Sequence, residues 1–244
     1  MQIPWALSAT TLSYNVPGTP NDLHLTGPII ADMFLGKITN WSDPQIKSLN
    51  PKASLPDLKI TPAYRADGSG DTYAFTDYLS RVSPQWKSTV GNSTSVSFPT
   101  GVGAKGNDGV AGIIKNTPGA IGYISVAYTL TNHLSVAAIR NSAGVFATPG
   151  LRAITAAAAT VKQVPANNEM HIVNPPKSAR AAYPISTFTY VVLPTSSPKA
   201  VELRRFVFWA LTQGQKFGPR LIFAKLPLPV LVAGEKTLKK VQAT

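Results

Sequence analysis

Apolar residues along the chain recur at two spacings, one typical of strands and one typical of helices. The residues Ala6–Tyr14 are apolar or β-branched often enough to favour a strand, and Asn15–Gly18 follows as a turn. The next segment predicts a helix, because a proline suits an early helical position and the apolar residues behind it share one helical face. That helix opens at Thr26–Pro28 and ends at Gly36.

The rest of the chain predicts further strands and helices in alternation. The predicted strands are Ile60–Tyr64, Ile121–Ile124 and Phe188–Leu193. The predicted helices are Asp43–Leu49, Ser69–Leu79, Asp108–Lys115, Leu151–Val161 and Ala200–Phe217. In the last helix, Leu203, Phe206, Val207 and Ala210 are expected to face inward. This alternation favours an α/β fold with a mainly parallel sheet.

Two segments are expected to carry the chain between two lobes. Gln163–Arg180 is polar and Pro-rich, and a second crossover is expected near Ser13–Pro17. The prediction is that residues 14–180 form a complete α/β lobe, while residues 1–13 and 181–244 form the remainder of a second lobe. A ligand would then lie between the two lobes.

Composition is that of a globular protein. The 244 residues, 44% of them hydrophobic, allow one large or two small domains with real cores. No apolar run reaches the ~18–20 residues of a membrane-spanning helix. The absence of cysteine excludes disulfide bonds, thiolate chemistry and cysteine-ligated zinc. The opening residues, Met1–Trp5, lack the basic and apolar regions of a secretory signal peptide.

The formal net charge of +12 is unevenly distributed. Residues 1–108 hold 8 basic and 8 acidic side chains, whereas residues 109–244 hold 15 basic side chains against Glu169, Glu202 and Glu235. A basic half can attract nucleic acid, anionic lipid or small anions, but it also fits a solvated basic surface. Because its basic residues are scattered and not interleaved with aromatic ones, nucleic acid is not expected as a partner. A basic nucleic-acid-binding domain stays open as an alternative.

An enzyme is not expected. A phosphatase would need a nucleophile with a general base, or a metal cluster. His24, His133 and His171 lie far apart in the sequence and show no metal-ligand spacing, so each is interpreted as a surface or loop residue. Neither a metal nor a cofactor is expected. A phosphatase-like enzyme that binds phosphate esters remains the other alternative.

The clearest chemical signal is the segment Arg65–Thr72, which lies between a predicted strand and a predicted helix. A Gly-rich turn at a helix N-terminus presents unpaired N–H groups and the positive end of the helix dipole, which together favour an anion. Gly68 and Gly70 would permit unusual torsions and a close approach to the backbone. Ser69 would cap the helix or donate to an oxyanion, and Arg65 suits bidentate binding of phosphate.

The same segment also fits a simpler interpretation, an ordinary Ser-capped helix with a tight turn and a solvated Arg65–Asp67 pair. It matches neither a Walker-type loop nor a dinucleotide-binding fingerprint. A second Gly-rich run, Gly101–Gly109, fits a surface loop with Asp108 near a helix N-terminus.

The segment resembles the phosphate-binding receptors of bacterial phosphate ABC transporters. The resemblance begins with Arg65–Gly70, followed by Phe75-Thr76 and Tyr78-Leu79. It continues in the same order along nearly the whole chain, at Leu35–Trp41, Asp43, Leu49–Pro51, Lys105–Val110, Pro118–Tyr123, Ala182–Ile185, Phe206–Gly214 and Leu226-Pro227. A joint match of this length is highly specific.

The resemblance implies a type II periplasmic binding fold, with two α/β lobes, mixed mainly parallel sheets and a ligand cleft. It implies that Arg65, Ser69, Gly70 and Asp71 bind phosphate and that Asp67 orients Arg65. The implied protein is a monomeric receptor that delivers inorganic phosphate to the membrane permease subunits of an ABC transporter. It would act in the periplasm or at the cell surface.

Two departures from the family pattern change these expectations. Many relatives have threonine where this chain has Asp71. This carboxylate would either accept a proton from the phosphate or sit favourably at the helix N-terminus. Family members also carry a further segment before the position of Ile3-Pro4. This sequence has no counterpart of that segment, whose ligands include a carboxylate that accepts the phosphate proton. The second lobe is therefore expected to be incomplete, and phosphate binding is expected to be weaker and less selective.

Overall fold

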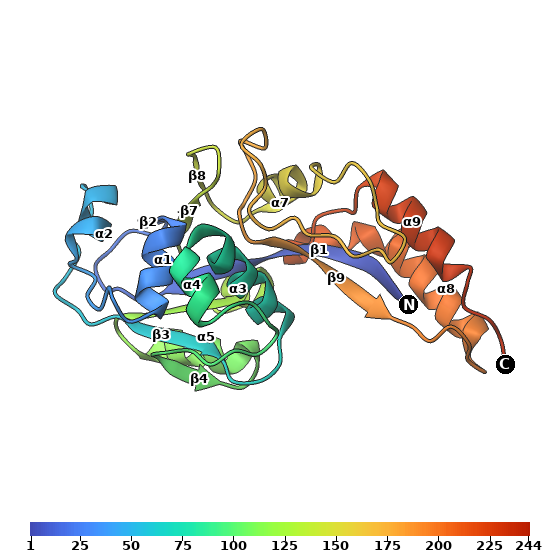
Figure 1. Cartoon of the computed structure of the whole chain (residues 1–244), viewed down its shortest axis with the longest axis horizontal. Helices are drawn as coiled ribbons and strands as arrows, with labels where there is room; N and C mark the ends of the chain where they lie inside the picture. Colours follow the sequence, from blue (N-terminus) through green and yellow to red (C-terminus); the bar gives the residue numbers. More distant parts are fainter.

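The structure, a computed structural model, describes all of residues 1–244 and consists of two lobes that share one long strand (Figure 1). This strand, β1 (Gln2–Tyr14), changes partner along its length. Its residues Gln2–Ala9 pair antiparallel with β9 (Ser186–Val192), whereas Thr10–Tyr14 pair antiparallel with β5 (Ala120–Ser125). The lobes therefore meet within a continuous strand, between Ala9 and Thr10.

The first lobe is built on a mixed sheet with the order β4-β3-β5-β1-β6. Its remaining strands are β3 (Thr61–Arg65), β4 (Val102–Ala104) and β6 (Ser135–Val136). β3 runs parallel to β4 and β5, while β1 runs antiparallel to β5 and β6. A small sheet of β2 (His24–Leu25), β7 (Ala138–Arg140) and β8 (Phe146–Ala147) lies beside it.

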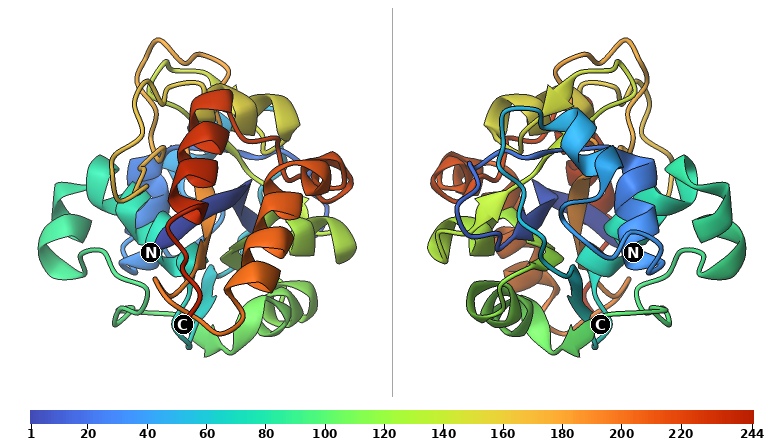
Figure 2. Two further views of the ribbon diagram at one scale, coloured as in Figure 1. Left: turned by 90° about the vertical axis from the view of Figure 1, so that its right-hand side faces the viewer. Right: turned by 90° about the vertical axis from the view of Figure 1, so that its left-hand side faces the viewer.

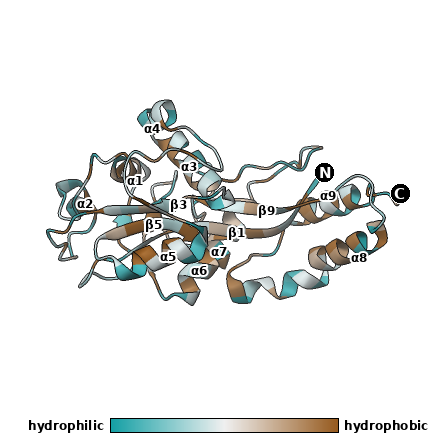
Figure 3. Ribbon diagram, turned by 90° about the horizontal axis from the view of Figure 1, so that it is seen from below, coloured by the Kyte–Doolittle hydropathy of each residue, from teal (hydrophilic) through white to brown (hydrophobic).

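Helices cover both faces of the first-lobe sheet. Figure 3 shows α1, α3 and α4 on one side of the strands, and α5 and α6 on the other. The bounds are α1 (Gly27–Phe34), α2 (Pro44–Leu49), α3 (Gly70–Val82), α4 (Pro84–Thr89), α5 (Gly106–Asn116) and α6 (Val126–Thr131). None of the helices in the molecule has the length and apolar character needed to cross a bilayer.

The second lobe contains fewer strands. The strand pair β1–β9 is accompanied by α7 (Leu151–Ala158), α8 (Ala200–Leu211) and α9 (Leu228–Leu238). Figure 2 shows α8 and α9 side by side over this end of the molecule. A Cβ on Gly234 of α9 would lie 3.2 Å from Ile3 of β1, so helix and strand are in close contact there.

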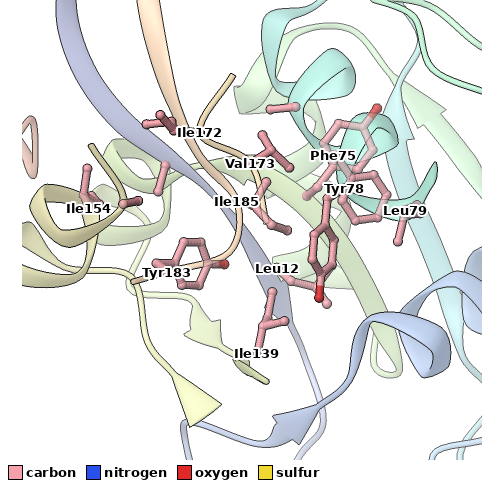
Figure 4. Close-up of a cluster of buried hydrophobic side chains, with 14 of the residues drawn as sticks. Leu12, Phe75, Tyr78, Leu79, Ile139, Ile154, Ile172, Val173, Tyr183 and Ile185 are labelled. Atoms are coloured by element: carbon pink, nitrogen blue, oxygen red, sulfur yellow. The ribbon is translucent and has the colours of Figure 1, made fainter. Parts of the chain in front are cut away.

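Buried side chains at the junction tie the lobes together. The larger of two hydrophobic clusters joins 46 buried residues from both lobes. Figure 4 shows Leu12 of β1 beside Phe75, Tyr78 and Leu79 of α3, with Ile139, Ile154, Ile172, Val173, Tyr183 and Ile185 around them. Burial raises the pKa of the Tyr183 hydroxyl well above its usual range.

The predicted fold class is confirmed: this is an α/β fold with mixed sheets. The expectation that the sheets are mainly parallel is wrong, because β1 pairs antiparallel with each of its three neighbours. All the predicted strands and helices are present, most with bounds shifted by a few residues. β1 begins at Gln2 rather than Ala6, and α4, α6 and α9 were not predicted. The predicted lobe ranges, 14–180 against 1–13 and 181–244, remain a prediction.

One predicted helix differs from expectation. It ends at Leu211, and the residues after it form short 3₁₀ turns at Gln213–Lys216 and Gly218–Leu221. Val207 is buried as expected, but Phe206 is 54% exposed, so its predicted inward orientation is wrong. A helical pattern identifies an apolar stripe, but it does not say whether the rest of the lobe covers it.

Gly119 provides a test of the packing at the start of β5. Its φ is +85°, and an added Cβ would lie 2.1 Å from the carbonyl oxygen of Lys59. Its own carbonyl accepts hydrogen bonds from Thr61 N and from the indole of Trp41. We expect Gly119→Ala to lower the free energy of unfolding by about 2–4 kcal/mol, from torsional strain and overpacking combined.

The matched control is Gly144→Ala, where φ is +81° but nothing lies within 4 Å of an added Cβ. Only the torsional strain applies there, so we expect a loss of about 1 kcal/mol. Urea denaturation of both variants measures the difference. Equal losses would contradict the packing described for Gly119.

Candidate anion-binding site

A cleft of ≈ 730 Å³ lies between the two lobes. The first lobe contributes Arg65 and the start of α3 to its lining, and the second lobe contributes residues of β9 and of the loop around Met170. Arg65 is the only arginine or lysine that lines the cleft. The basic surplus of the second half of the chain therefore lies elsewhere.

The start of α3 is fixed by Ser69. This residue has extended backbone torsions, and its hydroxyl oxygen accepts hydrogen bonds from the N–H groups of Asp71 (3.1 Å) and Thr72 (3.4 Å). Ser69 also donates its own N–H to the carbonyl of Thr94. Ser69 is thus the N-cap of α3, which holds the positive end of the helix dipole at the cleft.

Gly68 and Gly70 have no side chains to cover the backbone at this turn. A Cβ on Gly68 or Gly70 would meet nothing within 4 Å, and neither residue has a positive φ. The expectation that these glycines provide unusual torsions is therefore wrong. Their structural effect is to leave open space above the backbone N–H groups, where a ligand can approach.

Arg65, the last residue of β3, is held by Asp67 in a bidentate pair. Its Nε donates to one carboxylate oxygen of Asp67 at 2.7 Å, and its terminal nitrogen donates to the other at 2.5 Å. The N–H of Gly106 also donates to Asp67, at 3.0 Å. These hydrogen bonds, that from Arg65 first, hold the pKa of Asp67 well below its usual range. The same pair raises the pKa of Arg65.

Asp71 is the second residue of α3, and its carboxylate is enclosed. One oxygen accepts a hydrogen bond from the Thr10 hydroxyl at 2.7 Å, and the other accepts one from the Asn107 amide at 3.2 Å. A guanidinium nitrogen of Arg65 lies 4.0 Å away. Burial raises the pKa of Asp71, and the hydrogen bonds from Thr10 and Asn107 only partly oppose this effect.

Tyr123 of β5 forms hydrogen bonds on both sides of the turn, with the end of β3 and with the start of α3. Its hydroxyl accepts a hydrogen bond from Arg65 N at 3.1 Å and shares another with the Thr72 hydroxyl at 2.7 Å. Burial raises the pKa of Tyr123 to about 12. The end of β3 and the start of α3 are thus fixed to the central strand of the sheet.

The structure brings all the predicted site residues to one place: Arg65, Asp67, Ser69, Gly70 and Asp71. The sequence interpretation missed Thr10, Asn107 and Ser8. Asn107 lies in the second Gly-rich run, which was interpreted as a surface loop, whereas no sequence signal marks Thr10 or Ser8. Ser8 of β1 lines the cleft, and its buried hydroxyl has no hydrogen-bond partner.

The second lobe presents both apolar and polar side chains to the cleft. Ile172, Val173 and Phe188 line it, and Tyr190 accepts a hydrogen bond from Met170 N at 3.0 Å. His171 also lines the cleft and lies 3.4 Å from a carboxylate oxygen of Glu169. No group of three or more His, Asp or Glu side chains in the structure could hold a metal ion.

Comparison with known proteins identifies relatives of this chain. A family model described as a PBP superfamily domain matches residues 1–213. The phosphate-binding protein PstS of Xylella fastidiosa strain Temecula1 is 39% identical over 230 residues, which cover 93% of this chain and 63% of that protein. The protein of the same name from Pasteurella multocida is 37% identical over 248 residues, which cover 100% of this chain and 70% of that protein.

Solved structures show the same fold. The crystal structure of a DING protein superimposes with a TM-score of 0.75 at 19% identity, covering 96% of this chain and 71% of that one. A periplasmic phosphate-binding protein, PfluDING, superimposes with a TM-score of 0.73 at 20% identity, covering 95% and 69%. The chain thus spans less than two thirds of the Xylella relative and about 70% of these structures.

The matched relatives are named as binding proteins, which agrees with the prediction that the chain is not an enzyme. The family model matches most of the chain, and the Pasteurella protein matches all of it. The chain therefore belongs to the PBP superfamily and, within it, to the PstS family of phosphate-binding proteins.

Proposed function

We propose that this protein binds inorganic phosphate in the cleft between its lobes, through Arg65, Ser69, Gly70 and the start of α3. The observation that carries the proposal is the placement of a fixed guanidinium beside a capped helix N-terminus. Of the five N–H groups of Arg65, Asp67 takes two, which leaves three for an oxyanion. The N–H of Gly70, the first residue of α3, faces no intrahelical acceptor and is also free to donate.

Asp67 acts on phosphate indirectly. Its two hydrogen bonds fix the plane of the Arg65 guanidinium, so the entropy of ordering that side chain is lost on folding rather than on binding. Asp71 acts in the opposite sense, since an ionised carboxylate beside the anion would repel it. Its hydrogen bonds to Thr10 and Asn107 favour a role in fixing the start of α3 to β1.

Family membership supports a proposal about transport. We propose that the protein is the receptor of an ABC-type phosphate uptake system, a monomer that passes phosphate to membrane permease subunits. We place it in the periplasm or at the cell surface. The support is its similarity to the PstS proteins and to a structure described as a periplasmic phosphate-binding protein. The geometry favours neither a phosphatase-like enzyme nor a nucleic-acid-binding domain.

Isothermal titration of the purified chain with phosphate tests the proposal. We expect a saturable signal, and we expect Arg65→Ala to weaken binding about 10- to 100-fold, because charge-assisted hydrogen bonds to the anion are lost. Sulfate serves as the second ligand. The proposed ligands from Arg65 and the start of α3 are hydrogen-bond donors, which bind phosphate and sulfate alike, so we expect weak discrimination between the two anions.

The matched control is Arg152→Ala, which removes the same charge from an exposed position on α7 outside the cleft. Its affinity for phosphate should equal that of the unaltered chain. A loss as large as that in Arg65→Ala would mean that overall charge, and not the cleft, attracts the anion. No heat signal from a folded chain would refute phosphate binding.

The raised pKa of Asp71 makes phosphate binding depend on pH. The charged groups facing this carboxylate are Arg65 and, beyond it, Asp67, while its other neighbours, Thr10 and Asn107, do not titrate. As the pH falls through the raised pKa, Asp71 becomes neutral and its repulsion of the anion is lost. We therefore expect Asp71→Asn to bind phosphate about three- to tenfold more tightly at neutral pH.

The pH profile distinguishes the two roles considered for Asp71. The advantage of Asp71→Asn should shrink as the pH is lowered, because the unaltered chain then also carries a neutral group at this position. If Asp71 instead accepts a proton from bound phosphate, Asp71→Asn would bind more weakly than the unaltered chain wherever Asp71 is ionised. A parallel stability measurement should show the unaltered chain gaining stability as the pH falls through the same range.

A further inference from the structure

Ser8 lies on β1, the strand that both lobes share, and borders the cleft between them. It lines the cavity, and only 5% of the residue is exposed. Its pairing partner is Thr187 of β9, which lines the same cavity from the second lobe. Because paired residues on neighbouring strands direct their side chains to one face of a sheet, Ser8 and Thr187 both face the cleft.

The hydroxyl of Ser8 is buried and has no hydrogen-bond partner within the protein. Buried hydroxyls in native proteins are nearly always hydrogen-bonded, and an unpaired one costs stability. One other buried side-chain atom of the lining residues lacks a partner, a carboxylate oxygen of Asp77. An ionised carboxylate can only accept a hydrogen bond, whereas a hydroxyl can also donate one. Of these two atoms, only the Ser8 hydroxyl can therefore bind an anion.

Thr10 connects this face of β1 to the start of α3. Its hydroxyl donates to Asp71, the second residue of α3, at 2.7 Å. Residues i and i+2 of a strand direct their side chains to the same face, about 7 Å apart. Ser8 therefore lies one such step along the strand from the contact with α3, and it lines the same cavity as Ser69 and Gly70.

We propose that the Ser8 hydroxyl donates a hydrogen bond to the anion held by Arg65 and the start of α3. This inference rests on the proposed function, and it adds a ligand that neither the turn nor the helix supplies. Rotation about a single bond, Cα–Cβ, directs the hydroxyl. The anion would then contact both lobes, the first through Arg65 and α3 and the second through the part of β1 that pairs with β9.

Two other roles for Ser8 lead to different results on substitution. If the hydroxyl bonded to a group of the protein, its removal would destabilise the chain in the absence of any anion. If the side chain only filled space, another of similar size would replace it without loss. A hydroxyl that binds the anion affects affinity, and its removal leaves the stability of the free chain unchanged or raised, because no hydrogen bond is lost.

Isothermal titration with inorganic phosphate should compare the unaltered chain with Ser8→Ala and Ser8→Cys. We expect Ser8→Ala to weaken binding about tenfold, because a hydrogen bond to a charged group is lost. Ser8→Cys nearly retains the size of the side chain but carries only a weak donor, so its affinity should fall by a similar factor. Sulfate should lose affinity by the same factor in Ser8→Ala, since a hydroxyl donates to either anion.

The matched control is Ser13→Ala, the same substitution on the same strand. Ser13 is buried, its hydroxyl shares a hydrogen bond of 3.1 Å with that of Thr129, and it does not line the cleft. Its affinity for phosphate should be unchanged, while its melting temperature without phosphate should fall by about 2–4 °C, because a hydrogen bond is lost. Ser8→Ala should show the reverse, with no fall in the melting temperature of the free chain and a smaller rise when phosphate is added.

Three results would overturn the inference and leave the proposed function intact. The first is binding of phosphate by the unaltered chain and by Ser8→Ala with equal affinity, which would mean that the hydroxyl is not a ligand. The second is full affinity in Ser8→Cys alone, which would mean that the side chain acts by filling space. The third is a fall in the melting temperature of free Ser8→Ala as large as that of Ser13→Ala, which would make the hydroxyl structural. No binding by the unaltered chain would instead refute the proposed function, and this inference with it.

Discussion

The structure depends on the two-way pairing of β1. This strand pairs with β9 in one lobe and with β5 in the other, so its backbone hydrogen bonds fix where the lobes meet. The cleft lies at this change of partner: Ser8 and Ala9 of β1 line it, and Thr10 donates to Asp71 from the same stretch.

The first lobe is rigid where the anion would bind. Tyr123 forms hydrogen bonds with the end of β3 and the start of α3, and Asp67 fixes the orientation of the Arg65 guanidinium through a bidentate pair. Each contact orders a side chain or backbone segment of the site before an anion binds, so less conformational entropy would be lost on binding. The affinity would then depend mainly on these preorganised donors. The second lobe contributes polar and apolar side chains to the cleft in about equal number, so its surface does not by itself exclude water from the site.

Local sequence patterns predicted the elements that local interactions determine. The strand, glycine turn and capped helix at Arg65–Thr72 were predicted because capping and helix spacing act within a few residues. Thr10 and Asn107 were missed because each meets Asp71 only through the fold, from positions 61 and 36 residues away. The orientation of Phe206 was wrong for a related reason: its pattern marks an apolar face, and only tertiary structure shows that the face is uncovered.

The side chains that line the cleft carry more carboxylates than cationic groups. One arginine lines the cleft together with three carboxylates, those of Asp71, Asp77 and Glu169, so formal charge does not favour an anion. Asp77 is paired with Arg81 at 2.8 Å, and Glu169 lies beside His171 at the margin. The third carboxylate, Asp71, has a raised pKa in its enclosed position.

Attraction of an anion would therefore depend on directed hydrogen-bond donors, the Arg65 guanidinium and the first N–H groups of α3. These donors act at contact distance and are little screened by salt. The basic surplus on the rest of the surface would contribute to encounter with anions rather than to their binding in the cleft.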